Sequence, residues 1–422
     1  MNRSLTSSLR LGIAGVAVFA FGQIGLTSSP AFAQAPPPAA APPEAAPGAA
    51  PAAPPAAPTS PLTVPSMTGP LAAPVDPYHF DAAGLGTVYV TGAASGLLLY
   101  QGNSILGDKD TNIDLSNGML MIQKIDGLVQ FFVQVGGYSL PALGVNYHLT
   151  QRDGISLNDY FGGAPVAYAK IAPTDTFSIE GGKLPTLFGA EYTFTFQNMN
   201  IERGLLWSQE PAISRGVQAN LTTGPLLWQL SVNDGLYSDR FNWVDGAVTW
   251  TIDPINSLEV VAGGNVGTTS FNTIASPFFQ SNEDIFNVMY TYNNAPWTIT
   301  PYFQYTSVPK NAALGATAGA STWGGAVLAN YNIDANWNLS GRVEYITSSG
   351  SAAGGNANVL GFGPGSSAWS FTVTPTWQSG IWFTRLEGSY VGLSGITAPG
   401  GFGRSGSATS QGRFVLEGGV LF

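Results

Sequence analysis

Apolar and polar side chains alternate along many short segments of this chain. Between Trp369 and Trp377 the odd-numbered positions read Trp, Phe, Val, Pro and Trp, whereas the even-numbered positions hold one serine and three threonines. The same alternation recurs in segments 226–233, 297–306 and 337–345. A period of two places alternate side chains on opposite faces of a β-strand, and no helix has this spacing. The sequence therefore predicts strands with one apolar and one polar face.

Fifteen connections separate the predicted strands, and short connections alternate with long ones. Short turns are expected near residues 125–127, 172–175, 223–225, 253–256, 293–296, 334–336 and 378–380. Long loops are expected near residues 101–116, 136–164, 185–214, 234–242, 267–282, 307–320, 348–366 and 393–409. An even strand number with tight turns at one end and long loops at the other is typical of bacterial outer-membrane barrels. We predict an all-β fold, a transmembrane antiparallel β-barrel of about 16 strands with short periplasmic turns and long extracellular loops.

Composition agrees with a barrel in a membrane. Charged residues make up 9% of the chain, against about 25% in soluble domains. No later segment is a continuous apolar run long enough for a membrane helix, so a membrane form must be a barrel. A secreted soluble β-protein is the alternative, but its strands would expose a large apolar belt to water. The absence of cysteine excludes disulfides and thiolate metal sites.

The N-terminal region predicts export. Arg3 and Arg10 precede an apolar run over 11–21, and Ala-Phe-Ala follows at 31–33, so residues 1–33 are expected to be a signal peptide. A permanent membrane helix is the alternative, but the apolar run is shorter than the ~20 residues that a bilayer requires. Without the two arginines of the signal peptide, the chain has 13 basic and 25 acidic residues. This negative net charge argues against nucleic acid as a partner.

The segment after the signal is rich in alanine and proline. From Ala35 to Pro61, 23 of 27 residues are Ala or Pro, a composition that cannot bury a core and favours polyproline II. We predict a disordered periplasmic tether over 34–77 and one outer-membrane barrel over 78–422. A spacer that contacts peptidoglycan is the functional alternative for the tether.

Two further features bear on closure of the barrel. The chain ends in an alternating segment, 413–422, whose last residue is Phe422, and such an ending resembles the signal by which outer-membrane barrels are recognised for insertion. Pro301 and Pro375 lie inside predicted strands, where a closed sheet has no free edge. We expect these prolines at bulges or close to strand ends.

Charged residues on the polar faces are expected to line the lumen, because an Arg facing lipid at the midplane would cost about 2–4 kcal/mol. The predicted pore-lining residues are Glu180, Asp245, Glu259, Arg342, Glu344, Arg385, Glu387, Arg413 and Glu417. Arg385 is expected beside Glu417 if the last hairpin pairs about its loop. These charges would either orient solutes in a transverse field or form ion pairs that stiffen the wall.

The third long loop is the second candidate site. In sixteen-stranded general porins the third external loop folds inward, and this loop has the corresponding position. The predicted constriction residues are Lys183, Glu191, Glu202, Arg203, Glu210 and Arg215. The three glutamates would give a mild cation preference, and their joint neutralisation would lower it. The alternative is an external loop that packs on itself.

No pattern supports catalysis, a cofactor or a metal ion. The only histidines are His79, before the first predicted strand, and His148, in the second long loop beside Asp153. A barrel-embedded hydrolase using His148 is an alternative, but no nucleophile is marked. The glycine-rich stretch 401–406 leads into a strand, whereas a dinucleotide site needs a following helix. Histidine and acidic residues show no metal-ligand spacing.

Several local sequences resemble the OmpL-like β-barrel porin family of Gram-negative bacteria. These are Gly182-Lys183, Gly189-Ala190-Glu191, Asn198-Met199-Asn200 with Arg203, Gly216, and Asn233-Asp234-Gly235. The resemblance covers the barrel but not the Ala/Pro segment. It implies an outer-membrane location and a pore-like function without naming a substrate.

Together these features predict a porin-like passive diffusion channel for small hydrophilic solutes, weakly selective with a preference for cations. Its expected partners are outer-membrane lipids and small solutes, and a homotrimer is expected by analogy with other porins. A non-conducting barrel for adhesion or envelope structure is the main alternative, and it would show no conductance.

Overall fold

The computed structural model describes residues 69–74, 76–150, 160–270, 273, 275 and 277–422. The predicted signal peptide (1–33) and most of the predicted tether (34–77) lie outside these residues, as does Asp153. Within the described part of the chain, no helix is long and apolar enough to cross a membrane.

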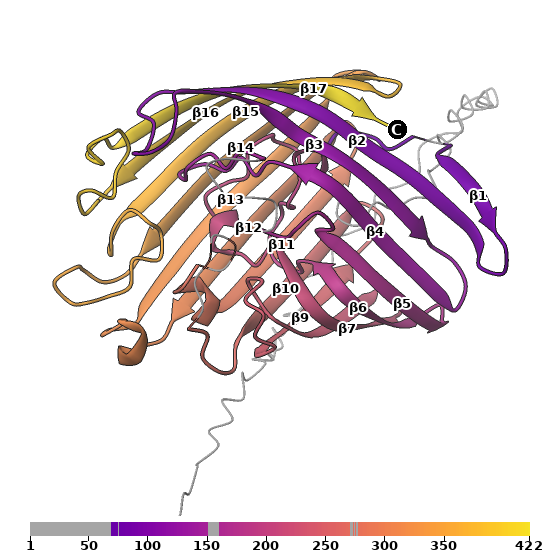
Figure 1. Cartoon of the computed structure of the whole chain (residues 1–422), viewed down its shortest axis with the longest axis horizontal. Coiled ribbons are helices and arrows are strands. Elements are labelled where there is room, and N and C mark those ends of the chain that lie inside the picture. Colours follow the sequence, from indigo (N-terminus) through magenta and orange to yellow (C-terminus); the bar gives the residue numbers. More distant parts are fainter. Residues whose placement is uncertain (1–68, 75, 151–159, 271–272, 274, 276) are drawn as a thin grey trace, which may run out of the picture. The chain divides into compact units, whose positions relative to one another are not determined.

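Sixteen antiparallel strands form one closed sheet, in which each strand pairs with its neighbours in sequence and β17 pairs with β2 (Figure 1). The barrel strands are β2 (Gly86–Gln101), β3 (Thr111–Lys124), β4 (Val129–Tyr138), β5 (Val166–Thr174), β6 (Phe177–Pro185), β7 (Ile213–Thr223), β8 (Leu226–Asn233), β9 (Trp243–Thr251), β10 (Asn256–Asn265), β11 (Asp284–Asn294), β12 (Trp297–Val308), β13 (Ala320–Asn332), β14 (Trp337–Ser348), β15 (Ser367–Ser379), β16 (Trp382–Ser394) and β17 (Ser410–Leu421). The predicted fold class and strand number are confirmed.

Among the described residues of the long loops, the structure has four short 3-10 helices: η2 (Thr195–Gln197), η3 (Trp207–Gln209), η4 (Gln280–Asn282) and η5 (Ala312–Leu314). The largest error in the predicted connections is at the first loop, because β3 begins at Thr111, inside the predicted loop 101–116. Ile113 is 77% exposed on the outer face while Asn112 and Ser116 are buried. The alternation is present there, but Asp114 and the asparagines obscured it.

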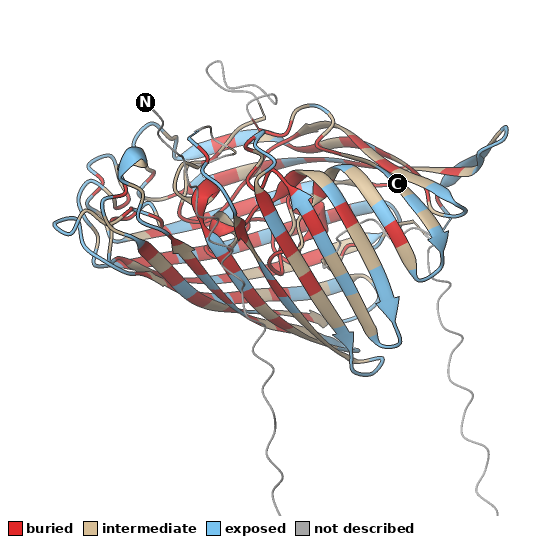
Figure 2. Ribbon diagram, turned by 90° about the horizontal axis from the view of Figure 1, so that it is seen from below, coloured by how far each residue is buried: buried red, intermediate tan, exposed pale blue. Residues whose placement is uncertain are grey.

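Alternation sorts the side chains between the outside and the lumen. Trp369 and Phe371 of β15 are 47% and 49% exposed, whereas Ser370, Thr372 and Thr374 are completely buried. Figure 2 shows the same banding of buried and exposed residues along most strands. Large aromatic residues are exposed at both ends of the strands, as in the girdles of outer-membrane barrels: Trp250, Trp297, Trp337 and Trp382 near the turns, and Trp323, Tyr345, Trp369 and Tyr390 near the loops.

The barrel closes where the two ends of the sheet meet. The β17–β2 ladder runs from Arg413 opposite Gln101 to Leu421 opposite Ala93. Beyond it, the Phe422 N–H donates to the Gly92 carbonyl (2.9 Å) and the Gly92 N–H donates to the Phe422 carbonyl (2.6 Å). The terminal residue therefore completes the seam with backbone hydrogen bonds, which leave no open edge at this point.

The expectation for the two prolines is wrong. Pro301 and Pro375 lie well inside β12 and β15, and the strand register does not shift at either position. Instead, two consecutive pairs are missing from one ladder beside each proline, between β11 and β12 and between β15 and β16. A proline lacks one N–H, so the hydrogen bonding to one neighbouring strand is interrupted while the pairing on its other side continues.

One strand was not expected. β1 (Tyr78–Ala82) pairs with the first residues of β2, from Gly86 to Val90, and forms a hairpin that is not part of the closed ring (Figure 1). His79 lies within β1 and not before the first strand.

Close backbone approach at the seam gives a stability prediction. A methyl group at Gly419 would lie 2.3 Å from the Ala94 carbonyl oxygen, whereas one at Gly388 would meet nothing within 4 Å. We expect Gly419→Ala to destabilise the barrel by about 1–3 kcal/mol through overpacking, and Gly388→Ala to have a much smaller effect. Thermal unfolding of the two variants in detergent would test this, and equal unfolding temperatures would contradict it.

Candidate functional site

The loop between β6 and β7, residues 186–212, lies inside the barrel. We call it the third loop. Its backbone meets inward-facing side chains of β16: Arg385 donates to the carbonyls of Thr195 (2.8 Å), Asn198 (2.8 Å) and Met199 (2.9 Å). Arg385 also lies 3.5 Å from Glu417, as the hairpin register predicts. A guanidinium on the wall therefore anchors the loop by saturating its carbonyl groups.

Carboxylates of the wall hold the same loop by its N–H groups. Glu387 accepts from the N–H groups of Ile201 (2.5 Å) and Glu202 (3.0 Å). Glu344 accepts from those of Leu205 (3.0 Å) and Leu206 (3.4 Å). Loop segments without regular structure leave backbone groups unpaired, and burying them without partners would be costly. These two strand residues supply the missing acceptors.

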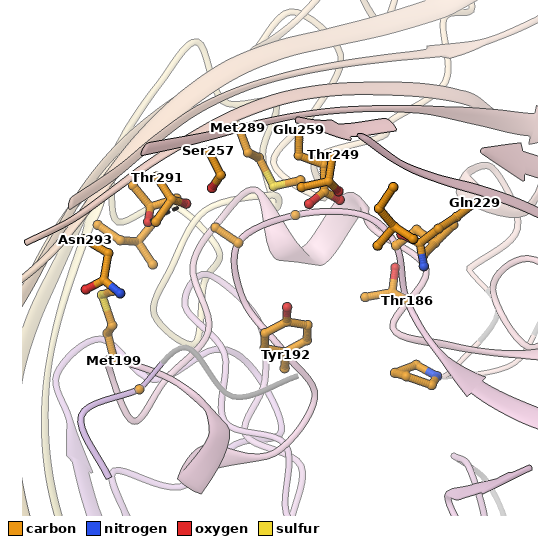
Figure 3. A pocket seen from close by; sticks show the side chains of 18 of the residues that line it. Thr186, Tyr192, Met199, Gln229, Thr249, Ser257, Glu259, Met289, Thr291 and Asn293 are labelled. Carbon is orange, nitrogen blue, oxygen red and sulfur yellow. Dashed lines mark hydrogen bonds between the residues drawn. The ribbon is translucent and has the colours of Figure 1, made fainter. Parts of the chain in front are cut away.

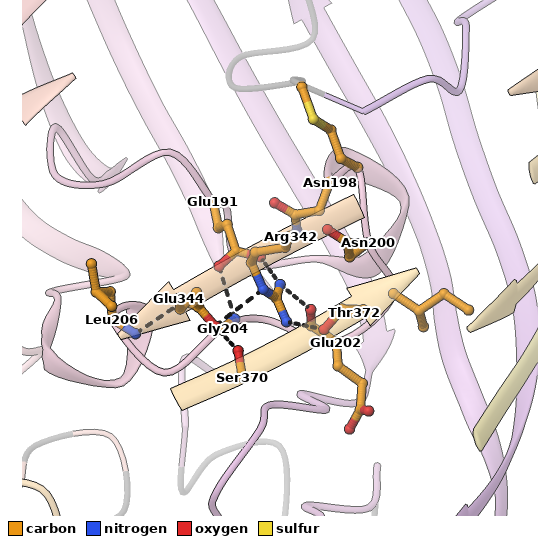
Figure 4. Close-up of polar contacts among 12 residues, drawn as sticks. Glu191, Asn198, Asn200, Glu202, Gly204, Leu206, Arg342, Glu344, Ser370 and Thr372 are labelled. Atoms are coloured by element: carbon orange, nitrogen blue, oxygen red, sulfur yellow. Dashed lines mark hydrogen bonds and ion pairs between the residues drawn. The ribbon is translucent and has the colours of Figure 1, made fainter. Parts of the chain in front are cut away.

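Ion pairs join the loop to β14 and β17, and Figure 4 shows the pair to Arg342 of β14. Arg342 lies 2.5 Å from Glu191 of the loop and 3.2 Å from Glu344 of its own strand. Arg413 lies 2.7 Å from Glu202. All of these side chains are almost completely buried. Charges of both signs are thus neutralised within the contact between wall and loop.

This geometry corrects the assignment of six predicted pore-lining residues. Arg342, Glu344, Arg385, Glu387, Arg413 and Glu417 point inward, but the third loop covers them. Glu191 and Glu202, predicted to face the channel, are 1% and 0% exposed in ion pairs with the wall. The structural reading of these charges, as ion pairs that stiffen the wall, fits the geometry.

The second long loop also reaches the lumen. Arg413 donates to the carbonyls of Ala142 (2.7 Å) and Val145 (2.6 Å). The backbone N–H of Arg203 in the third loop donates to the Pro141 carbonyl (3.1 Å), and the backbone carbonyl of Arg203 accepts from the Leu143 N–H (2.9 Å). The two loops therefore form one packed body against β14–β17.

Two charged side chains of the third loop are buried without hydrogen-bond partners among the described residues. Arg203 is fully buried, and its guanidinium lies 5.3 Å from the centre of the Trp207 ring. Burial lowers the pKa of Arg203 to about 10, although Glu191 and Glu202 act in the opposite direction. Glu210 is 4% exposed, and burial raises its pKa well above the usual range, with Glu191 and Glu344 adding repulsion.

Lys183 and Arg215 do not reach the constriction. They lie opposite each other in the β6–β7 ladder, on the same outward face as the exposed Val217. Both cations lie against the ring of Tyr237, at 5.6 Å and 4.0 Å. Arg215 also pairs with Asp234 at 2.8 Å. These two residues therefore fasten the outer rim at the loop end of the barrel.

A cavity remains between the third loop and the opposite wall (Figure 3). It measures about 710 Å³ and is lined by residues of β5–β13 together with the loop. Glu180 of β6 and Glu259 of β10 are the only charged residues among the described residues that line it. Asp245, also predicted to line the pore, is 5% exposed and accepts a hydrogen bond from Asn233 (2.7 Å). Two of the nine predicted pore-lining residues thus line this cavity.

A second cavity adjoins the first at the turn end of the barrel. That chamber measures about 1230 Å³ and is formed by the β3–β4 and β5–β6 turns and the adjoining strands. Glu180, Leu227 and Gln229 line both spaces. The two adjoining cavities follow strands β5–β12, and we call them together the passage.

A short segment before β1 also enters the lumen, which the sequence did not indicate. The Gly69 N–H donates to the Gln197 carbonyl of the third loop (3.0 Å). Ala72 and the side chain of Gln378 exchange two hydrogen bonds (2.9 and 3.0 Å). Leu71 is 3% exposed in a cluster with Phe194. Residues 69–74 therefore fill space beneath the loop, and their Ala- and Pro-rich context gave no signal for it.

No metal centre emerges from the described residues. No group of three or more His, Asp or Glu side chains among them is placed to hold a metal ion. His148 packs edge-on against Tyr160, with ring centres 5.4 Å apart.

The buried pair at Arg342 gives a prediction for the loop. Arg342→Met would leave Glu191 and Glu344 buried without their cation, which costs about 3–5 kcal/mol for such pairs. We expect the loop to detach from β14 and the single-channel conductance in planar bilayers to rise. Arg404→Met, an exposed position in the last loop, is the control. Unchanged conductance of the Arg342 variant would show that this pair does not hold the loop.

The raised pKa of Glu210 predicts a pH effect on stability. The folded protein keeps this proton at pH values where the unfolded chain, with a pKa of about 4.3, has lost it. The stability contributed by Glu210 is therefore complete below that pH and declines as pH rises towards the folded pKa. Glu210→Gln should unfold at a higher temperature than the wild type at pH 8 and at a similar temperature at pH 4.

Thermal unfolding in detergent at both pH values measures this difference. Asp76→Asn, an exposed carboxylate before β1, is the matched control and should change neither value. A Glu210 variant that is less stable than the wild type at pH 8 would refute the prediction.

Comparison with known proteins agrees with this architecture. The chain matches the family described as "Putative beta-barrel porin-2, OmpL-like" over residues 87–422. No curated protein matches it. Among solved structures, it is similar to OmpT of Vibrio cholerae, with 13% identity, a TM-score of 0.52, and 82% of this chain and 100% of that chain covered.

Two other solved structures are similar. The anion-selective porin from Comamonas acidovorans has 11% identity and a TM-score of 0.52, with 79% of this chain and 99% of that chain covered. The outer-membrane channel DcaP of Acinetobacter baumannii has 10% identity and a TM-score of 0.54, with 81% and 99% covered. These likenesses concern the fold. Because the family match spans most of the chain, the protein belongs to the OmpL-like β-barrel porin family and is a channel protein of the outer membrane.

Proposed function

We propose that this protein is a passive diffusion channel for small hydrophilic solutes with a weak preference for cations. The observation that carries the proposal is the passage along β5–β12, which consists of a cavity of about 710 Å³ and an adjoining cavity of about 1230 Å³. Its wall offers hydroxyl and amide groups that form hydrogen bonds with a polar solute. Charged side chains that line the pore determine which ions enter. A channel of this kind needs no chemical step, so the proposal includes no enzymatic activity.

The cation preference is assigned to Glu180 and Glu259. Neither belongs to the buried pairs beneath the third loop, and both line the passage. Lys170 lies directly opposite Glu180 in the β5–β6 ladder and offsets part of its charge. Glu259 faces Thr249 and Met289 on the neighbouring strands, so no cation is paired with it in either ladder. Glu259 is therefore expected to contribute more than Glu180.

Reversal potentials in planar bilayers test the assignment. Glu259→Gln should lower the K⁺ over Cl⁻ permeability ratio by roughly twofold to fivefold, the effect of about 1 kcal/mol between charges 4 Å apart in water. Glu180→Gln should lower it less, and the double variant most. Asp81→Asn, in β1 outside the ring, is the control for loss of one negative charge. A wild type without conductance would reject the channel, and unchanged reversal potentials would reject the assignment.

We also propose a homotrimer. OmpT of Vibrio cholerae has been solved in a trimer form, and the broad apolar outer face of this barrel is available for contact between copies. Native mass measurement of the purified protein in detergent distinguishes a trimer from a monomer.

A further inference from the structure

The cavity between the third loop and the wall has two chemically different sides. The wall contributes carboxylates, hydroxyls and amides, among them Glu259, Thr249 and Gln229. The third loop contributes mainly hydrocarbon, from Leu187, Ala190 and Met199. Figure 3 shows Glu259 and Thr249 on one side of the space and Met199 on the other. A solute that fills this space meets an anionic polar surface and an apolar surface at the same time.

Oxygen acceptors gather around Glu259. Thr249 lies opposite Glu259 in the β9–β10 ladder, so their side chains share the inner face. Ser257 lies two residues before Glu259 on that same face, and Thr291 is opposite Ser257. One carboxylate and three hydroxyl groups thus face the same space. A primary ammonium group has three N–H donors and one positive charge, which this arrangement of acceptors satisfies.

The opposite side suits the rest of such a molecule. Leu187, Ala190 and Met199 offer contact to an alkyl chain, and burial of apolar surface there is favourable. Tyr192 lies on this side too, and its ring adds apolar contact area. The volume of about 710 Å³ is within the range of about 300–1,000 Å³ that is usual for small-molecule sites.

From this juxtaposition we infer that the cavity is a transient binding site for small organic ammonium ions with an apolar tail. The inference rests on the proposed channel function and names the solute class that the same passage favours. The head group binds at Glu259, and the tail lies against Leu187 and Met199. Inorganic cations use only the first contact, and neutral or anionic solutes with the same tail lack it.

Single-channel recording in KCl with added alkylammonium chlorides tests the inference. Interruptions of the K⁺ current should lengthen from methylammonium to n-butylammonium, by up to about fourfold for each added methylene that is fully buried. Ethanolamine, which has a polar tail, and butyrate, which has the opposite charge, should give short interruptions or none. Leu187→Asn should remove the dependence on tail length, and Leu187→Val should retain most of it.

The variants separate the two contacts. Glu259→Gln should shorten the interruptions by every ammonium ion, whereas Leu187→Asn should shorten those by n-butylammonium and leave those by methylammonium at the wild-type length, a response that only a folded channel can give. Interruptions that do not depend on tail length in the wild type, or that persist unchanged in Leu187→Asn, would overturn the inference while the channel function stands. A wild type that carries no current would reject the channel and this inference with it.

Discussion

Hydrogen bonding of the backbone in a medium without water is the constraint on which this structure depends. In hydrocarbon every N–H and C=O group needs a partner within the protein, and an antiparallel sheet meets that requirement when its last strand pairs with its first. Here β17 meets β2, and Phe422 and Gly92 complete the seam with two backbone bonds. The two prolines interrupt single ladders without opening the ring. The alternation of apolar and polar side chains along each strand then follows, because a closed sheet has one face toward lipid and one toward the lumen.

The same requirement explains the charges inside the barrel. A loop of irregular backbone in the lumen carries groups that strands would have paired. Arg385, Glu387 and Glu344 supply the missing donors and acceptors from the wall. Burial makes each of these contacts costly to break, and it removes the charges from the passage. Glu180 and Glu259 line the cavity that remains beside the loop, and we propose that they act on solutes there.

The sequence predicted the fold well and the site only in part. Period-two alternation determines which face of β15 meets lipid, so Trp369 and Ser370 could be assigned without coordinates. It also indicated that Arg342 and Arg385 point inward, but alternation carries no information on what lies across the lumen. Lys183 and Arg215 were placed in the constriction because of their position beside the loop, although their parity within β6 and β7 directs them outward. The segment 69–74 enters the lumen through contacts that join residues about 130 to 310 positions apart, such as Gly69 with Gln197 and Ala72 with Gln378. No local pattern encodes such distances.

The ion pairs between the third loop and the wall lie on β14–β17, whereas the cavity beside the loop lies along β5–β13. Strands β14–β17 face packed loop, so a change there alters folding and heat resistance before it alters transport. Parts of strands β6–β12 line the passage, where inward side chains such as Gln229, Thr249 and Ser257 face the cavity. Divergence in solute preference can therefore accumulate on one half of the wall while the other half keeps the loop in place. Related barrels that carry different solutes would share the contacts between the third loop and β14–β17 and would differ in the side chains that line the passage.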